Sequence, residues 1–306
     1  MQIRLQRRAM MSTQSNAAEK AAVSVLDRLV AGSRVLCDGA MGTMLCERGI
    51  SIDRCYDVLN LSQPEMIAAI HAEYVQAGAE IVETNTFGAN VHRLERHGLR
   101  DQVRAINLAG ARLARQCAAD SADEVCVAGA VGPLGVRLES GAARAAFAEQ
   151  IRALADGGVD LLMIETMMSL AEAAEAIGAA HEVAPGLRTV VMMTVGEDGN
   201  CLDGATVELA AARLTELGAD AVGCNCSFGP ATVLAAIQRM RAVTHLPLAA
   251  MPNAGLPRVV EGRAVYAISP EEMAGFARRI VEAGASLIGG CCGTTPDHIR
   301  AMRSVV

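Results

Sequence analysis

The chain has 306 residues, of which 52% are hydrophobic and 20% charged, a composition typical of a folded protein with a sizeable core. The net charge of -7 and a pI near 5.5 argue against a general nucleic-acid-binding protein, which needs a basic face. Aromatic residues make up only 2% and tryptophan is absent, so an aromatic cage for a quaternary ammonium ligand is not expected.

The first twenty residues are polar and basic, and we expect a disordered tail at 1–20 before a single folded domain at 21–306. A translation start at Met10 or Met11 is an alternative, and a targeting peptide is a lesser one. Before Asp38 the chain has no apolar run long enough for a signal peptide or a membrane span. Ten cysteines are too sparse for a disulfide framework in a chain of this length. We therefore expect a cytoplasmic protein with reduced thiols, and neither nucleic acid nor membrane as a partner.

One pattern recurs along the chain: a helical stretch, then a glycine, one or two small or acidic residues, and a short apolar run. It occurs as QAGAEIVETN, DGGVDLLMIET, ELGADAVGCNC and EAGASLIGGCC. Glycine suits the left-handed position that ends a helix, and short, uniformly apolar runs are typical of strands buried on both faces. The chain contains eight such predicted strands, at 34–38, 80–85, 125–130, 160–165, 188–194, 220–225, 247–251 and 286–290.

Amphipathic helical stretches separate these strands, at 64–77, 101–118, 142–156, 169–182, 205–217, 230–242 and 270–283. Strict alternation implies a parallel sheet, and eight strands with no interrupting domain predict a single-domain (β/α)8 TIM barrel. An open doubly wound sheet is the alternative, but the glycines of DGAMGTM have the wrong spacing for a dinucleotide-binding turn. Long unstructured loops are expected at 39–63, 131–141 and 252–269, each after a strand.

The C-terminal ends of barrel strands carry the active site in enzymes of this fold. Six of the predicted strands end in polar or thiol groups, which are Asp38, Asn85, Glu165, Asn225 with Cys226, Asn253, and Cys291 with Cys292. The third and fifth strands, which end in GAVGPLG and MMTVG, deliver no group to which we can assign a role.

Three thiols are expected to converge at this end of the barrel, from Cys226, Cys291 and Cys292. Three cysteines make a soft, anionic site suited to Zn2+, and a set of three protein ligands leaves one position open, as in catalytic zinc sites. The glycines around the CC pair let both sulfurs face one ion. Cys224 is the rival ligand, because on a regular strand it shares the side-chain direction of Cys226 but lies deeper in the barrel.

Two carboxylates, Asp38 and Glu165, follow the first and fourth strands. A pair of this kind also occurs in glycosidases, but that function leaves the three cysteines without a role. A carboxylate is equally suited to the ammonium group of an amino-acid substrate. The alternative for Glu165 is a helix-capping acid at the turn that follows its strand.

With these motifs, the sequence resembles the zinc-dependent homocysteine S-methyltransferases from about residue 33 to its C-terminus. The shared signatures are DGAMGTML, ETNTFGAN, GPLG, IET, GCNCSFGP, MPNAGLP and GGCCGTTPDHI. These motifs most resemble those of the homocysteine-binding module of cobalamin-dependent methionine synthase. They also resemble those of the N-terminal half of bifunctional proteins that join this module to a methylenetetrahydrofolate reductase. The resemblance implies a TIM barrel with zinc on the three cysteines named above.

The resemblance also implies where the substrate lies. Asp38 and Glu165 would hold the amino group of homocysteine, while the backbone at Gly39 and Ala40, together with Asn85, would meet its carboxylate. Larger members of the family continue into folate, cobalamin or reductase domains, whereas this chain ends shortly after the CC pair. The resemblance therefore predicts the thiol half of the reaction and leaves the methyl donor open.

The expected function is transfer of a methyl group to the thiolate of homocysteine, which gives methionine. A free thiol with a pKa of ~8.5 is mostly protonated at neutral pH, and binding to a metal deprotonates it. Candidate donors are S-methylmethionine, S-adenosylmethionine, methylfolate and methylcobalamin, the last two with a corrinoid or folate-reductase partner protein. Two alternatives stand beside this function: a non-catalytic thiol-binding accessory module for such a partner, and a structural zinc site closed by Cys224.

Overall fold

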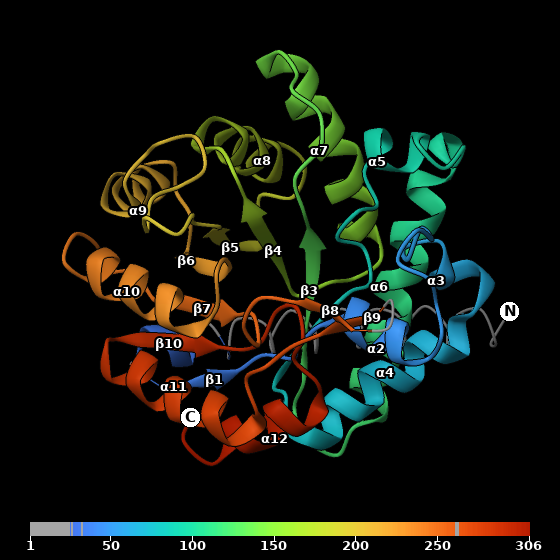
Figure 1. Cartoon of the computed structure of the whole chain (residues 1–306). Coiled ribbons are helices and arrows are strands. Elements are labelled where there is room, and N and C mark those ends of the chain that lie inside the picture. The colour runs from blue at the N-terminus through green and yellow to red at the C-terminus, as the bar shows by residue number, and fades with distance from the viewer. Residues whose placement is uncertain (1–24, 26, 32, 261–262) are drawn as a thin grey trace, which may run out of the picture.

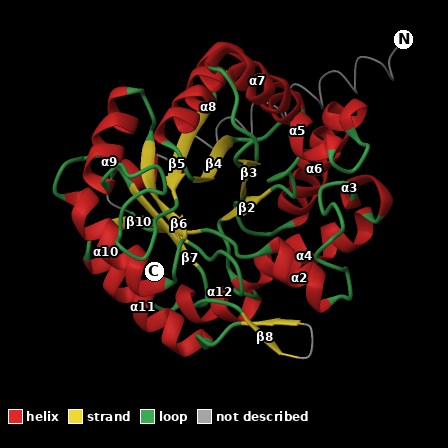
Figure 2. Ribbon diagram, turned by 45° about the horizontal axis from the view of Figure 1, so that its top comes forward, coloured by secondary structure: helices red, strands yellow, loops and turns green. Residues whose placement is uncertain are grey.

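In the computed structural model of this protein, residues 25, 27–31, 33–260 and 263–306 are described. The expected tail at 1–20 lies outside these residues. Eight parallel strands form a barrel that is surrounded by helices (Figures 1 and 2). They are β1 (Val35–Leu36), β2 (Ile81–Glu83), β3 (Cys126–Val131), β4 (Leu161–Met167), β5 (Arg188–Met193), β6 (Ala221–Cys226), β7 (Leu248–Pro252) and β10 (Ala285–Ile288). Each of the eight predicted strands is present, within a few residues of its predicted bounds.

The sheet has the order β1-β10-β7-β6-β5-β4-β3-β2, so sequential strands are neighbours except where the hairpin β8–β9 intervenes between β7 and β10. The two edge strands also meet, because Cys37 and Ile81 form a parallel bridge. Beside this bridge, the amide of Glu80 donates to the carbonyl of Leu36 at 2.7 Å, and the amide of Asp38 donates to the carbonyl of Ile81 at 3.0 Å. The sheet therefore closes on itself, which confirms the predicted TIM barrel.

The helices that cover the barrel follow the predicted order and end where local sequence stops them. They are α4 (Pro64–Ala77), α6 (Val103–Asp120), α7 (Ser140–Asp156), α8 (Leu170–Val183), α9 (Val207–Glu216), α10 (Pro230–Arg241), α11 (Pro270–Glu282) and α12 (Pro296–Arg303). In α4, Pro64 occupies the first turn and Gly78 ends the helix in the left-handed conformation, with φ of 106°. In α12, Thr295 caps the first turn through a capping box with His298.

Two of the three predicted loops contain regular structure that we did not expect. The segment 39–63 forms α2 (Met41–Glu47) and α3 (Leu59–Ser62), and 252–269 forms the antiparallel hairpin of β8 (Arg258–Val260) and β9 (Arg263–Val265). A further short helix, α5 (Val91–Glu95), and the 3-10 turn Arg100–Gln102 lie before α6. Packing stabilises these short elements, since Met44 and Leu45 of α2 are buried. The third loop remains irregular until α7 begins at Ser140.

The alternation of side chains along each strand divides the core into two parts. Inward residues such as Ile81, Leu161 and Ala221 fill the barrel interior, which Val25 and Leu29 join from ahead of β1. Outward residues pack against the helices in a larger, separate cluster. Membership of one part or the other shows whether a buried apolar side chain of a strand points into the barrel or toward the helices. Among the described residues, no helix is both long and apolar enough to span a membrane.

Candidate functional site

The end of β6 turns Cys226 away from the direction that regular strand geometry would give it. Ala221 faces the barrel interior, whereas Cys224 lies in the outer cluster against the helices, so a regular strand would also point Cys226 outward. Instead, Cys226 and Ser227 have positive φ angles of 53° and 63°. This left-handed turn, which costs roughly 1 kcal/mol or more per non-glycine residue, carries the thiol to the mouth of the barrel.

The same observation corrects our expectation for Cys224. Its thiol does not share the direction of Cys226; it contacts the hydroxyl of Ser227 at 3.4 Å within the helix-facing layer. The expectation failed because it assumed regular alternation through Cys226, and the left-handed turn breaks that alternation. Among the described residues, the group of thiols close enough to share one ion consists of Cys226, Cys291 and Cys292.

The segment after β10 holds Cys291 and Cys292 through backbone hydrogen bonds to the neighbouring strand ends. The amide of Cys291 donates to the carbonyl of Pro252, and the carbonyl of Cys292 accepts from the amide of Ala254, both at 2.9 Å. Gly293 has a φ of 83°, and a side chain there would overlap the ring of Tyr266. The glycine after the CC pair therefore serves both the turn and the close packing of this tyrosine.

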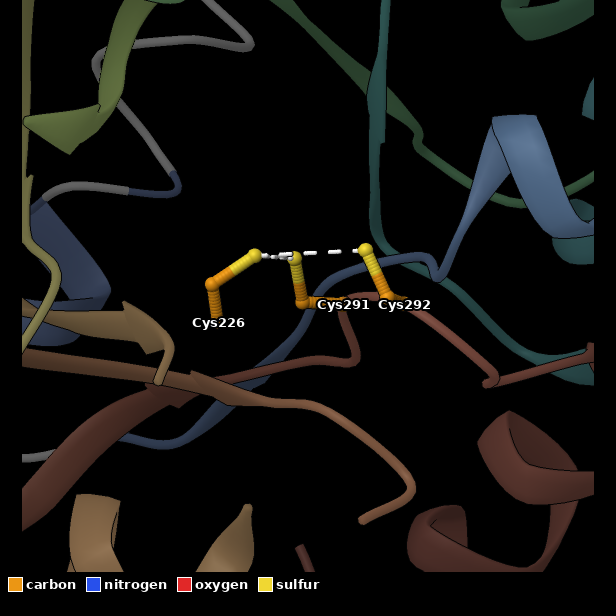
Figure 3. A group of neighbouring side chains, drawn as sticks. All are labelled: Cys226, Cys291 and Cys292. Atoms are coloured by element: carbon orange, nitrogen blue, oxygen red, sulfur yellow. Dashed lines mark hydrogen bonds between the residues drawn. The ribbon is translucent and has the colours of Figure 1, made fainter. Parts of the chain in front are cut away.

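The three sulfurs point toward one another (Figure 3). The Sγ of Cys226 lies 2.8 Å from that of Cys291 and 4.0 Å from that of Cys292. A disulfide would need about 2.05 Å, and all three residues are free cysteines. Zn–S bonds of ~2.3 Å in tetrahedral geometry place two sulfurs about 3.8 Å apart, so a small opening of the Cys226–Cys291 pair fits this donor set to zinc.

The thiols strongly affect one another's protonation. Contacts with the Cys226 and Cys291 thiols lower the pKa of Cys292 to about 3, while contacts with its two thiol neighbours and burial raise the pKa of Cys291. In the absence of a metal ion, the three cysteines therefore favour a state in which one of them, Cys292, is a thiolate. A divalent cation would displace the remaining protons, as expected for a cysteine metal site.

A second cluster, made of carboxyl groups, lies next to the thiols. Asp38 follows β1, Glu83 ends β2 and Glu165 lies in β4, and Asp38 and Glu165 are buried. The Oδ2 of Asp38 accepts from the amide of Glu83 at 2.9 Å. Burial raises the pKa of Asp38 and of Glu83 to about 8, and burial together with the neighbouring Glu83 carboxyl raises that of Glu165. Among the described residues, none of the three forms an ion pair with Lys or Arg.

Asn225 joins the carboxyl cluster to the thiol cluster. Its Nδ2 donates to the Oε2 of Glu165 and to the hydroxyl of Thr166, and its Oδ1 accepts from the amide of Thr166, all at 2.8 Å. Thr166 has a φ of 55°, so this amide also supports a strained backbone position in β4. Cys226 follows Asn225 directly in the chain. The end of β6 therefore positions both the Glu165 carboxylate and the Cys226 thiol.

The other predicted substrate-binding residues are Gly39, Ala40 and Asn85, and their polar groups have different partners. Gly39 and Ala40 follow Asp38, and the amide of Ala40 donates to the hydroxyl of Thr294 at 3.2 Å. The side-chain amide of Asn85 instead donates to the carbonyl of Tyr56 at 2.8 Å, and to Asn60 Oδ1 at 3.1 Å. The structure therefore brings Asp38, Glu165 and the thiols together, and uses the nitrogen of Asn85 to hold the loop after β1.

Sequence analysis missed three residues that support the site. Thr194, after β5, accepts from the amide of Ser227 at 3.2 Å, although we had found no polar group for that strand end. The ring of Tyr266, which directly follows the hairpin β8–β9, packs against Gly293, the residue after Cys292. Glu83 had a usable signal, because it is a charged residue within a buried strand and has the same inward parity as Ile81.

Comparison with known proteins shows the family to which this chain belongs. The sequence profile of the homocysteine S-methyltransferase family matches residues 35–306. The chain is 36% identical over 293 residues to methionine synthase of Mycobacterium leprae, and 35% identical over 289 residues to that of Mycobacterium tuberculosis. Each match covers 88% of this chain and 24% of the relative, so the chain spans about a quarter of the length of these proteins.

Solved structures of the homocysteine methyltransferase MmuM from Escherichia coli have a similar fold. The metallated form matches with a TM-score of 0.77 and 28% identity, over 89% of this chain and 96% of that one. The oxidized form matches with a TM-score of 0.80 and 27% identity, over 92% and 99%. The resemblance noted in the sequence is thereby confirmed: this chain belongs to the homocysteine S-methyltransferase family.

Proposed function

We propose that this protein transfers a methyl group to the sulfur of homocysteine, with Zn2+ held by Cys226, Cys291 and Cys292. The observation that carries the proposal is the position of three thiols directly beside a cluster of buried carboxyl groups. Homocysteine has a thiol at one end and an α-ammonium group at the other. A site that offers soft anionic sulfurs next to uncompensated carboxyls is complementary to both ends of such a molecule.

Some residues of the chain bind the substrate, and others hold these residues in the required orientation. Asp38 and Glu165 receive the ammonium group, and the backbone at Gly39 and Ala40 borders the substrate carboxylate. Asn225 keeps Glu165 in place through its 2.8 Å contact. Zinc would supply the Lewis acid that keeps the substrate sulfur as a thiolate at neutral pH. The barrel contributes orientation, so that the sulfur faces the methyl group of the donor in line.

The open mouth of the barrel is where a methyl donor must arrive. Cys292 is exposed there, and Phe228 and Met168 have exposed fractions of 41% and 39% in the neighbouring loops. The donor is to be sought among S-methylmethionine, S-adenosylmethionine, methylfolate and methylcobalamin, each offered to zinc-loaded protein with homocysteine while methionine is measured. Methylfolate and methylcobalamin call for a corrinoid or folate-reductase partner protein.

The metal step is tested by content, coordination and activity together. Cys292→Ser should lose bound zinc and methionine formation, because it removes one of three sulfur ligands. Cys117→Ser, a half-buried thiol on α6, is the matched control and should retain both. Zinc X-ray absorption should show three sulfurs in the free protein and four with homocysteine. Full turnover after complete chelation, or a sulfur count that ignores homocysteine, would contradict the proposal.

A further inference from the structure

The hydroxyl of Thr294 joins the two halves of the proposed homocysteine site. Thr294 lies shortly after the CC pair and is fully buried. Its Oγ1 accepts from the amide of Ala40 at 3.2 Å and donates to the carbonyl of Cys291 at 2.7 Å. One hydroxyl therefore connects the backbone proposed to border the amino-acid end of the substrate with the backbone of a proposed zinc ligand.

Two glycines leave the space that this hydroxyl occupies. A β-carbon added to Gly39 would lie 2.7 Å from the Oγ1 of Thr294, and one added to Gly290 would lie closer still. Interiors packed this closely have no room for such an atom, so a side chain at either position would displace the hydroxyl. The glycines of DGA and GGCC therefore have one reason in common, which is the close approach of two loops around Thr294.

Further hydrogen bonds hold the same two loops together. The amide of Gly290 donates to the carbonyl of Asp38 at 2.9 Å. The hydroxyl of Tyr74, on α4, is fully buried and lies 3.1 Å from the carbonyl of Ala40 and 3.2 Å from that of Thr294. The loop after β1 and the loop after β10 are therefore fixed relative to each other.

The separation of these loops matters because homocysteine would be held at both ends. Its sulfur would bind zinc beside Cys291, and its ammonium group would meet Asp38. Two methylene groups separate the α-carbon from the sulfur in homocysteine, whereas cysteine has one. One missing methylene group typically changes discrimination by roughly 10- to 200-fold. Only a fixed separation can exploit this difference, because loops that were free to move would adjust to the shorter chain.

We propose that Thr294 is a positioning residue that sets this separation and thereby makes the site selective for homocysteine over cysteine. The inference rests on the proposed binding of homocysteine between zinc and Asp38. Cysteine on the zinc falls short of the amino-acid half of the site, so its affinity does not depend on where that half lies. Loss of the Thr294 hydroxyl should therefore weaken homocysteine much more than cysteine.

Substitutions of Thr294 separate the hydroxyl from the shape of the side chain. Thr294→Val replaces the hydroxyl with a methyl group and leaves the amide of Ala40 without its partner. The Kd of homocysteine should rise about tenfold, while that of cysteine stays within about threefold of the wild type. Thr294→Ser keeps the hydroxyl and should restore the selectivity to within about threefold of the wild type.

Two other variants test the same loops and a remote position. Tyr74→Phe removes the second contact between the loops while Thr294 stays in place, and it should lower the selectivity about threefold. Thr189→Val is the matched control. Thr189 is a fully buried threonine in β5, and its hydroxyl has no hydrogen-bond partner among the described residues. Its substitution should leave every Kd unchanged.

The measurement is calorimetric Kd on the zinc-loaded full chain with homocysteine, cysteine and 1-propanethiol, after the zinc content of each variant is determined. The Kd of 1-propanethiol reports the zinc half alone and should be the same in every variant. The proposal is overturned if the wild type does not discriminate between homocysteine and cysteine. It is also overturned if Thr294→Val weakens both equally or leaves homocysteine unchanged.

If Thr294→Val does not fold or does not retain zinc, Tyr74→Phe decides the question. Unchanged selectivity in Tyr74→Phe then overturns the proposal, and a selective loss of homocysteine affinity supports it. Wild-type protein that binds none of the three thiols would overturn the proposed function itself. That outcome is distinct from all those in which only the selectivity differs.

Discussion

Replacing Asn225 by alanine should cost more stability than a typical buried polar substitution and should weaken homocysteine binding as well. The side chain is fully buried and makes three hydrogen bonds of 2.8 Å, which link β4 to β6 across β5. At ~1 kcal/mol net for each bond, the direct loss is about 3 kcal/mol. The amide of Thr166 would lose its partner at a strained φ of 55°, so this value is a lower bound.

Urea unfolding of the metal-free protein measures this loss, and thermal unfolding should show a decrease in Tm of roughly 6 °C. The release of Glu165 should raise the Kd for homocysteine about tenfold while leaving that of an amino-free thiol unchanged. Both effects follow from one side chain, because the Asn225 amide donates to the Glu165 carboxylate and accepts from the backbone amide of Thr166.

Asn107 provides the matched control on α6. It is also fully buried, and its amide donates to the carbonyls of Ala89 and Val103 at 2.8 Å, remote from the thiols. Asn107→Ala should lose about 2 kcal/mol and retain wild-type homocysteine affinity. Equal weakening of homocysteine in both variants would refute the reasoning, since the effect would then report general destabilisation. So would an Asn225→Ala protein as stable as the wild type.

Three further predictions concern single side chains. Cys224→Ala should keep full zinc content by elemental analysis, because its thiol faces the helices; loss of zinc would place it among the ligands. Burial raises the pKa of Asp38 to about 8, above its unfolded value, so the stability that its protonated form contributes to the metal-free protein is fully present below about pH 4 and is lost as the pH rises through 8. Between pH 5 and 8 this residue should lower the free energy of unfolding, measured with urea, by about 1 kcal/mol per pH unit, in addition to the contributions of Glu83 and Glu165. Asp38→Asn should make the measured slope shallower by about that amount. Gly293→Ala should displace the ring of Tyr266 and lower zinc retention, whereas Gly275→Ala, with no atom within 4 Å of the added carbon, should be neutral or gain up to ~1 kcal/mol in denaturation.

The barrel itself could be predicted because its signals are local and repeated. A left-handed glycine follows the preceding helix ahead of β2, β4, β6 and β10, as in Gly78 and Gly218, and short apolar runs recur along the whole chain. The short helices α2 and α3 gave no such signal, since elements of seven and four residues depend on burial against the rest of the protein. The hairpin β8–β9 did have a signal, two β-prone runs around a glycine-containing pair, which was overlooked.

The sequence predicted which residues form the candidate site better than it predicted where their side chains point. Strand ends identified the thiols and two carboxyls, because a barrel presents those ends at one face. Glu83 was missed because only the last residues of the strands were considered, whereas Cys224 was misplaced because regular alternation was assumed to continue through Cys226. Parity places Glu83 inward with Ile81, and it places Cys224 outward, once Asn225 is recognised as the inward residue beside Glu165.

No pattern in the sequence predicted the left-handed turn at Cys226 and Ser227, because non-glycine residues seldom adopt it and both side chains would fit an ordinary strand. The turn persists because its surroundings hold it. The hydroxyl of Ser227 accepts from the amide of Val195 at 3.0 Å, and its carbonyl accepts from Asn253 at 2.9 Å. Loops after β5 and β7 thus stabilise a conformation that β6 would not adopt alone. A strained backbone with this much support is expected where a thiol must point away from the helix-facing core to meet two others. The support connects the position of Cys226, the proposed metal ligand, to the loops after β5 and β7.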